Sequence, residues 1–260
     1  MHALLVSPMV YQLTLSYCGR NYAGWQRQAN ALAVQEVVEG ALGEVVGHEV
    51  RIQGASRTDK GVHARGQVVH LALEQDFSIS GLVYGTNQCL PEDIRVLRAQ
   101  QVGDDFHARK SATAKEYRYR LIRADVLSPL EARFGVRIDP RLDLEVAKAA
   151  SRCLLGEHDF SAFARSGGSH LDPRRSIYSV DWTAGRDVGC GEEVVLKIVG
   201  NGFLRGMVRC IVGTLLEIGL MRRPADSLKH LLAGGERCAA GPTAPPQGLS
   251  LHRVIYPAGI

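Results

Sequence analysis

Two kinds of hydrophobic spacing follow each other along the first hundred residues. Apolar and polar residues alternate in residues 11–17, 50–54 and 94–102, and residues 68–73 form a more continuous apolar run, as strands do. In residues 33–46 the apolar positions recur every three or four residues, which places one apolar face on a helix. Residues 79–89 predict a second helix despite two glycines. The resulting order is β-α-β-β-α-β.

The second half repeats this order without repeating the residues. Its predicted strands are 115–122, 176–183, 193–199 and 249–256, and its predicted helices are 144–155, 205–220 and a short extra helix at 225–232. The predicted fold class is therefore α+β, with two ferredoxin-like halves. We expect the boundary near residues 102–105, which gives an N-terminal domain of residues 1–104 and a C-terminal domain of residues 105–260.

A charged turn interrupts the apolar pattern between two strands of the first half, in GASRTDKGVHARGQVVHL, residues 54–71. Arg57, Thr58 and Asp59 stand at the break, so the pattern offers a carboxylate at a strand end. Three glycines in this stretch allow a tight backbone or the close approach of a ligand, and Lys60 and Arg65 add positive charge around Asp59. An ordinary polar hairpin is the alternative interpretation.

Two stretches combine aromatic with basic residues, as proteins that hold single-stranded or flipped nucleotides do. In KEYRYRL, residues 115–121, strand alternation places Tyr117 and Tyr119 on one face and charged residues on the other. Six Lys or Arg accompany a single Glu116 in residues 106–123, so a tyrosine could stack on a base there, or both rings could pack in the core. WQRQ, residues 25–28, could touch RNA or form a turn anchored by a buried Trp25.

A predicted helix near the C-terminus carries two arginines on an apolar background. In NGFLRGMVRCIVG, residues 201–213, helical spacing aligns Arg205, Arg209 and Gly213. A buried, unpaired guanidinium would be costly, so Arg209 needs a carboxylate or a phosphate, and Asp59 is the candidate partner. The alternative is an arginine whose head reaches water along the helix surface.

Composition narrows the function classes. The 260 residues are 45% hydrophobic and 22% charged with a net charge of +4, which indicates a soluble globular protein whose binding of a polyanion would need a local basic surface. Six cysteines without a Cys-x-x-Cys pair argue against a zinc site or a disulfide scaffold. Without a secretory signal pattern or an apolar stretch of roughly 20 residues, we expect a cytoplasmic protein with no membrane partner.

Several enzyme chemistries have little support. Asp59, His63, His70 and His107 match no dense metal-ligand spacing, and nearby cationic side chains would repel a metal ion. Neither a G-x-G-x-x-G nor a G-x-x-x-x-G-K-[ST] loop joins a predicted strand to a helix, so nucleotide-cofactor and kinase chemistry are disfavoured. A G-x-S-x-G elbow for a serine hydrolase is also missing.

Five stretches together resemble the TruA family of tRNA pseudouridine synthases. They are YAGWQRQ at 22–28, SRTDKGVHARGQVVH at 56–70, DDFHARKSATAKEYRY at 104–119, LLGEHDFSAF at 154–163 and FLRGMVRCIVGTLLEIG at 203–219. The resemblance implies an isomerase that converts uridine to pseudouridine at positions 38, 39 and 40 of the tRNA anticodon stem-loop, without cofactor or metal. It also implies a cytoplasmic homodimer whose ferredoxin-like halves join their sheets across a basic cleft. A catalytically silent RNA-binding protein on the same scaffold is the alternative.

The resemblance also implies roles for individual residues. Asp59 matches the family's catalytic aspartate, Tyr117 its active-site tyrosine and Arg209 the arginine of its M-V-R block, and these three are the expected catalytic residues. The expected substrate-binding residues are Arg57, Thr58, Tyr117 and Arg205. The chain departs from the family pattern at Ser56 and Lys60, neither of which removes a functional group, although Lys60 could alter the approach of the RNA backbone. Gly206 replaces a larger residue of the pattern, which bears on how that helix contacts RNA.

Overall fold

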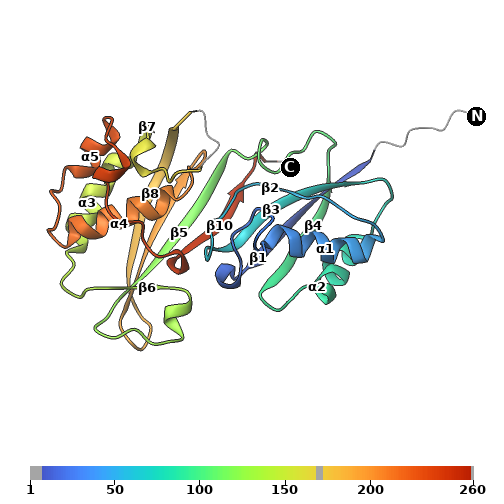
Figure 1. Ribbon diagram of the computed structural model, residues 1–260, viewed down its shortest axis with the longest axis horizontal. Coiled ribbons are helices and arrows are strands. Elements are labelled where there is room, and N and C mark those ends of the chain that lie inside the picture. The colour runs from blue at the N-terminus through green and yellow to red at the C-terminus, as the bar shows by residue number, and fades with distance from the viewer. Residues whose placement is uncertain (1–7, 168–171, 259–260) are drawn as a thin grey trace, which may run out of the picture. The chain divides into compact units, whose positions relative to one another are not determined.

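The computed structural model describes residues 8–167 and 172–258 and shows an α+β protein whose strands pair almost entirely antiparallel (Figure 1). The chain divides into two compact units. The first takes in the chain up to Thr113 together with the residues from Leu251 onward, and the second runs from Ala114 to Ser250. Within the described ranges, no helix is long and apolar enough to cross a membrane.

The first unit is an antiparallel sheet with two helices against one face. Its elements are β1 (Met9–Tyr17), α1 (Val34–Val46), β2 (Gln53–Gly54), β3 (His63–Leu73), a π-helical turn (Gly81–Gly85) that continues into α2 (Thr86–Cys89), β4 (Ile94–Val102) and most of β10 (Leu249–Ile255). The sheet order is β4-β1-β3-β10, and β2 also pairs with β3. The predicted strands and helices of this half are confirmed, although β2 is shorter and β3 begins earlier than expected.

Burial in the first unit follows the hydrophobic pattern of the sequence. Alternate residues of β1 are buried, and α1 buries Val34, Val38 and Leu42 at helical spacing. The helix ends at Gly47, whose left-handed backbone (φ 82°) donates its N–H to the Gly43 carbonyl, a common way to close a helix. Local propensity and tertiary burial therefore agree in this half.

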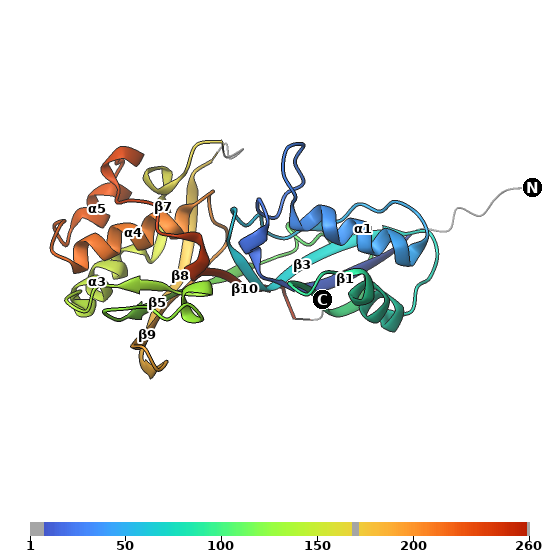
Figure 2. The same ribbon diagram turned by 60° about the horizontal axis from the view of Figure 1, so that its bottom comes forward.

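The second unit is a sheet of order β5-β9-β8-β7, with β6 added parallel to β5. Its elements are β5 (Ala114–Arg123), β6 (Val136–Ile138), α3 (Leu144–Ser151), β7 (Gly156–Asp159), β8 (Arg174–Asp187), β9 (Glu192–Gly200), α4 (Met207–Gly219) and α5 (Ser227–Leu232). Figure 2 shows the three helices together above one face of this sheet. The short strands β6 and β7 were not predicted from the sequence.

The division between the units differs from the expected boundary at residues 104/105. Phe106 and Ala108 lie in a buried cluster with Ala55 and Val68, and the Phe106 ring packs on Tyr256 with centroids 5.3 Å apart. The Tyr256 hydroxyl donates to the Ala108 carbonyl at 2.6 Å. These contacts hold the segment after β4 in the first unit.

The closing strand of the second half also differs from its predicted place. The Thr113 N–H donates to the Ile255 carbonyl at 2.9 Å, and β10 lies next to β3, so most of β10 belongs to the first unit. The second unit is therefore an insertion between Thr113 and Leu251. Hydrophobic periodicity predicts that residues 249–256 form a strand but does not show which sheet the strand joins. The return of the chain to the first unit is therefore not visible in the sequence pattern.

Candidate active site

The Arg57–Asp59 stretch is a tight connection between β2 and β3 of the first unit. The Ala55 N–H still pairs with the Val68 carbonyl at 2.8 Å, after which the chain leaves the β-ladder. The turn closes where the Val62 N–H donates to the Asp59 carbonyl at 3.1 Å, with Gly61 at φ 79°. A left-handed residue of this kind favours glycine. The strand-turn-strand prediction around Asp59 is therefore confirmed.

Gln67, a fully buried residue of β3, holds the start of this turn. Its side-chain Oε1 accepts the Ser56 N–H at 3.2 Å, and its Nε2 donates to the Ser56 carbonyl at 2.6 Å. The carboxamide thus replaces the two hydrogen bonds that a neighbouring strand would have supplied. The sequence alone does not distinguish Gln67, because nothing local marks a glutamine whose side chain bonds to a backbone eleven residues away.

The middle of the turn is held from the other side by residues that follow β1. The Trp25 N–H donates to the Thr58 carbonyl at 3.1 Å, and Gly24 forms an isolated β-bridge with Asp59. The buried hydroxyls of Tyr17 and Thr58 are hydrogen-bonded at 2.8 Å. Thr58, expected to bind substrate, is only 7% exposed, so its observed contacts are with the fold itself.

The remaining side chains of the turn point outward to different degrees. Asp59 is half-buried, whereas Arg57 and Lys60 are exposed. A carboxylate therefore lies on a backbone that is fixed on both sides, beside an accessible guanidinium. A positioned carboxylate of this kind can act as a nucleophile or as a general base.

The other predicted site residues lie in the second unit. Tyr117, on β5, is 5% exposed and its ring packs edge-on against Phe203 with centroids 5.0 Å apart. Arg209, on α4, is 8% exposed, and its Nε donates to the Ala244 carbonyl at 2.8 Å. The Arg209 side chain is therefore largely buried and is held in part by a backbone carbonyl of its own unit. Whether Tyr117 and Arg209 form one site with Asp59 stays a prediction.

The predicted alignment of Arg205 with Arg209 on one helix is wrong. Gly206 adopts a left-handed backbone at φ 71°, so α4 begins at Met207, and Arg205 lies in the preceding turn with its Nη1 on the Ser166 carbonyl at 3.1 Å. A Cβ at Gly206 would lie 2.5 Å from the Cδ of Arg165. The glycine that departs from the family pattern thus makes room for an arginine side chain across the start of the helix.

The charged face of β5 is less available than the sequence indicated. Each of its three arginines pairs with a carboxylate of the same unit: Arg118 with Glu116, Arg120 with Glu131 and Glu193, and Arg123 with Glu192. Glu116 itself is fully buried. Tyr119 is also buried, its hydroxyl donates to the Pro245 carbonyl at 2.6 Å, and burial raises the pKa of this phenol. Of the two alternatives for these rings, the structure shows both tyrosines buried, and stacking of Tyr117 on a base stays a prediction.

In the aromatic-basic cluster at residues 25–28, Trp25 anchors a turn, as one of the two interpretations predicts. Trp25 is buried and stacks on Tyr17 with ring centroids 6.0 Å apart. A Cβ at Gly54 would lie 2.6 Å from the indole Nε1, so the glycine at the end of β2 allows the indole to pack against the backbone. The tryptophan therefore anchors the segment that holds Thr58 and Asp59.

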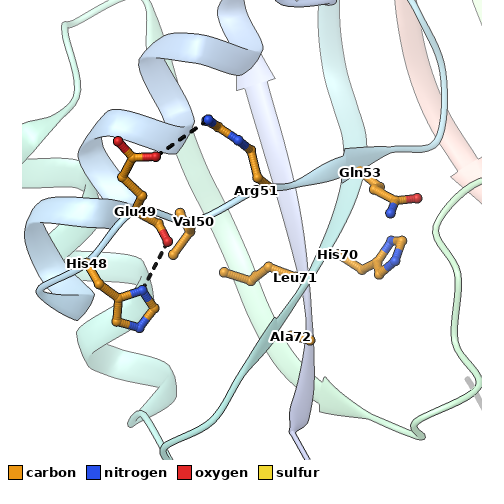
Figure 3. Close-up of a pocket in the computed structure, with 8 residues that line it drawn as sticks. All are labelled: His48, Glu49, Val50, Arg51, Gln53, His70, Leu71 and Ala72. Carbon is orange, nitrogen blue, oxygen red and sulfur yellow. Dashed lines mark hydrogen bonds and ion pairs between the residues drawn. The ribbon is translucent and has the colours of Figure 1, made fainter.

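A cavity of about 280 Å³ in the first unit lies apart from these residues (Figure 3). It is lined by His48, Glu49, Val50, Arg51, Gln53, His70, Leu71 and Ala72. These include the far end of β3 from the turn, and none of the predicted site residues is among them. Among the residues that the structure describes, no group of three or more His, Cys, Asp or Glu side chains is arranged to hold a metal ion.

The chain is similar to known proteins over most of its length. A family model described as tRNA pseudouridine synthase matches residues 14–109 and 150–257. A protein of Syntrophotalea carbinolica named tRNA pseudouridine synthase A is 45% identical over 95% of this chain and 96% of its own length. Proteins of the same name from Thermoanaerobacter sp. strain X514 and Myxococcus xanthus are 41% and 40% identical, over 94% and 95% of this chain and 98% and 92% of their own lengths.

Proposed function

Because the chain belongs to the tRNA pseudouridine synthase family, we propose that it is an isomerase that converts uridine to pseudouridine in tRNA, with the Asp59 carboxylate as its central catalytic group. The single observation that supports this role most strongly is the construction of the turn. Gln67 fixes Ser56, Trp25 fixes Thr58, and the Asp59 side chain remains half-exposed. Holding a reacting group in place in this way removes an entropic cost from the chemical step.

The reaction needs what this turn provides. Pseudouridine forms when the C–N glycosidic bond breaks, the freed uracil turns over and a C–C bond joins the same sugar carbon to ring carbon C5. The product has the same atoms as the substrate, so no electron acceptor is consumed. A carboxylate can begin the process by attacking the sugar or the uracil ring, or by removing a sugar proton. A general base then takes the proton from C5 and passes it to solvent, and ring nitrogen N1, freed from the sugar, gains a proton, so the number of protons is unchanged.

Residues of the second unit complete the proposed site. Arg209 is proposed to pair with Asp59 and orient it, and Tyr117 to stack on the flipped uracil and to help remove the C5 proton. The Tyr117 ring is buried against Phe203, so stacking requires a rearrangement that uncovers it. Exposed Arg57 and Arg205 are proposed to contact the RNA backbone or to fill the space that the nucleotide leaves.

The observed strand orders support the proposed architecture. In the first unit β4-β1-β3 with β2 on β3 is the antiparallel order of a ferredoxin-like fold, and β5-β9-β8 reproduces three strands of that order in the second. The homodimer, the basic cleft, the anticodon stem-loop as target and a cytoplasmic place of action stay predictions. Light scattering of the purified protein tests the dimer directly.

The decisive experiment is release of tritium from tRNA labelled at uracil C5. The wild-type protein should release it, and Asp59→Asn should bind tRNA with the same affinity but release none, because the amide keeps the shape and loses the charge. Glu74→Gln removes an exposed carboxylate from the same unit and should react like the wild type. Tight tRNA binding by a wild-type protein that releases no tritium would favour the catalytically silent alternative.

The proposed ion pair makes a separate prediction. Arg209→Ala should reduce turnover more than tRNA affinity, whereas Asp59→Ala should lower the free energy of unfolding by leaving Arg209 without its counter-charge. The double substitution should then recover part of that loss, because coupled residues give non-additive changes. Additive changes in the free energy of unfolding would show that Arg209 acts independently of Asp59.

Binding of tRNA through its backbone predicts a steep salt dependence. Each neutralised phosphate contributes about 0.9 to the slope of log affinity against log salt, so several Lys or Arg contacts give a slope of several units. Arg57→Ala should reduce that slope by about one. A flat response to salt would contradict phosphate contact as the main source of affinity.

A further inference from the structure

Residues 26–32 form an exposed loop between Trp25 and Ala33, both of which are buried. All seven residues are exposed, and Leu32 leaves 53% of its surface in solvent, so its side chain is available for contact. Figure 2 shows the loop in blue, standing out from the first unit beside the start of α1. We call it the 26–32 loop.

The loop is preformed by its own hydrogen bonds. Its base is closed where the Ala23 N–H donates to the Leu32 carbonyl at 2.9 Å, and Gln28 and Ala31 form a β-bridge near its tip. Gln35, at the start of α1, accepts at its Oε1 from the Gln26 Nε2 at 2.7 Å and from the Arg27 N–H at 3.1 Å. A partner that binds this loop therefore has little conformational entropy to remove.

The residues just before the loop form backbone hydrogen bonds with the turn that carries Asp59. Gly24, immediately before the loop base, is bridged to Asp59, and the Trp25 N–H is bonded to the Thr58 carbonyl. Gly24 has φ 114°, and a Cβ there would lie 2.7 Å from the Thr58 carbonyl oxygen, so the two backbones are in direct contact. A hairpin of this length rises roughly 10 Å, at about 3.3 Å per residue. A nucleotide placed at Asp59 therefore has neighbours within reach of the loop.

The charge of the loop is unsuited to phosphate. Arg27 is its only ionisable side chain, and the guanidinium Nε lies 3.4 Å from a carboxylate oxygen of Glu39, whose side chain is almost fully buried. A second carboxylate, on Glu36, lies 3.9 Å from the guanidinium. The arginine is thus paired within the unit, although Glu39 also pairs with Arg51. The tip of the loop consists of Ala29, Asn30 and Ala31, and Leu32 lies exposed at its base. Such a surface fits the apolar faces and edges of bases and riboses.

We propose that the 26–32 loop contacts the nucleotides that flank the target uridine, through Leu32 and Asn30 and without a phosphate contact. The proposal rests on the proposed function, which places a flipped uridine at Asp59. When a nucleotide leaves the stack, its neighbours lose a stacking partner, and a rigidly held apolar side chain can cover the exposed base face. The loop then favours the RNA conformation in which the uridine is flipped out, and it contributes to which uridines are modified.

The test compares two leucines of similar exposure in the same unit. Leu32→Ala removes the proposed contact, and Leu97→Ala is the matched control, since Leu97 on β4 is 49% exposed. Leu32→Ala should lower kcat/KM for tRNA by about fivefold or more, as expected for loss of the methyl and methylene groups of one newly buried leucine. Leu97→Ala should stay within about twofold of the wild type, and Asn30→Ala should show a smaller loss than Leu32→Ala.

Salt dependence separates this contact from a phosphate contact. The slope of log(kcat/KM) against log salt should be the same for Leu32→Ala and the wild type, in contrast to Arg57→Ala. Equal kcat/KM values for Leu32→Ala and Leu97→Ala, or a changed salt slope for Leu32→Ala, would overturn the proposal. If the wild type releases no tritium, the proposed function is wrong, and the loop contact is then tested by tRNA binding alone. A higher Kd for Leu32→Ala than for Leu97→Ala would support the contact, and equal Kd values would contradict it.

Discussion

Replacement of Gln67 tests whether the turn that carries Asp59 is held by one buried carboxamide. Gln67→Met keeps the length of the side chain and removes both of its hydrogen bonds to the Ser56 backbone. Each buried backbone group that loses its partner costs about 1–3 kcal/mol, so the free energy of unfolding of the first unit should fall by about 2–4 kcal/mol. Urea unfolding in a Trp182→Phe background measures this loss, because Trp25 is then the reporter.

The same substitution should affect turnover more than binding. Ser56 lies three residues before Asp59, and a shift of about 1 Å in a reacting group can cost about a hundredfold in rate. We therefore expect the kcat of Gln67→Met to fall by about ten- to a hundredfold with little change in KM for tRNA. Gln53→Met changes an exposed glutamine of β2 and should leave kcat unchanged.

Gln67→Glu provides a second test, because its effect on kcat should depend on pH. A protonated glutamic acid can still donate to the Ser56 carbonyl, whereas a carboxylate cannot and would be repelled by that oxygen. Burial favours the protonated form, so the kcat of Gln67→Glu relative to wild type should be highest at low pH and fall as pH rises. The corresponding ratio for Gln67→Met should stay low and flat. Wild-type kcat and stability in Gln67→Met would refute the role of this clamp.

Two further substitutions test the packing of the first unit. Gly24→Ala should lower the free energy of unfolding by more than about 2 kcal/mol and reduce kcat, because it adds backbone strain at φ 114° and a contact of 2.7 Å with the Thr58 carbonyl oxygen. His70 accepts the Ala108 N–H at its Nδ1 at 3.1 Å, and burial, followed by the neighbouring His107, lowers the pKa of its ring. The neutral ring therefore contributes stability that is present above about pH 6.5 and is lost as pH falls towards the lowered pKa. Urea unfolding should show this loss of stability as pH falls below about 6.5, and His70→Asn should reduce it.

Matched controls exist for both substitutions. Gly185 also has a positive φ, 103°, but a Cβ there meets nothing within 4 Å, so Gly185→Ala should cost only the strain, about 1 kcal/mol. His48 is exposed, and His48→Asn should leave the pH dependence of stability as in the wild type. Equal costs for Gly24→Ala and Gly185→Ala would show that the contact with Thr58 is unimportant.

The spacing of apolar residues correctly predicted the longer strands and helices, whose buried faces follow that spacing. The alternation in residues 11–17 and the helical spacing in residues 33–46 correspond to β1 and α1, because the residues that define each pattern also form its buried face. The strands β6 and β7, of three and four residues, are too short to show a period. The start of α4 depends on one backbone angle at Gly206, which spacing alone does not reveal.

The sequence predicts the site residues that lie in a local motif, but not the residues that hold them from distant parts of the chain. Asp59 stands out because charge interrupts an apolar pattern, whereas Gln67 and Tyr17 act through contacts that only the folded chain creates. The arginines of β5 look like a nucleic-acid surface in the sequence, but each pairs with a carboxylate: Arg118 with Glu116 on the same strand, and Arg120 and Arg123 with Glu193 and Glu192 on β9. The Arg120 partner Glu193 is 73 residues away, beyond the reach of a local pattern.

The discontinuous first unit has a consequence for the order in which the protein is made. A ribosome delivers residues up to Thr113 long before Leu251, so β3 must wait for its neighbour β10 while the whole inserted unit is synthesised. During that interval one edge of β3 is covered only by the two-residue strand β2, and the uncovered part of that edge can pair with a strand of another chain. Unfinished chains on the same messenger RNA are therefore most prone to pair with one another at β3. Fast folding of the inserted unit shortens the time in which this can happen.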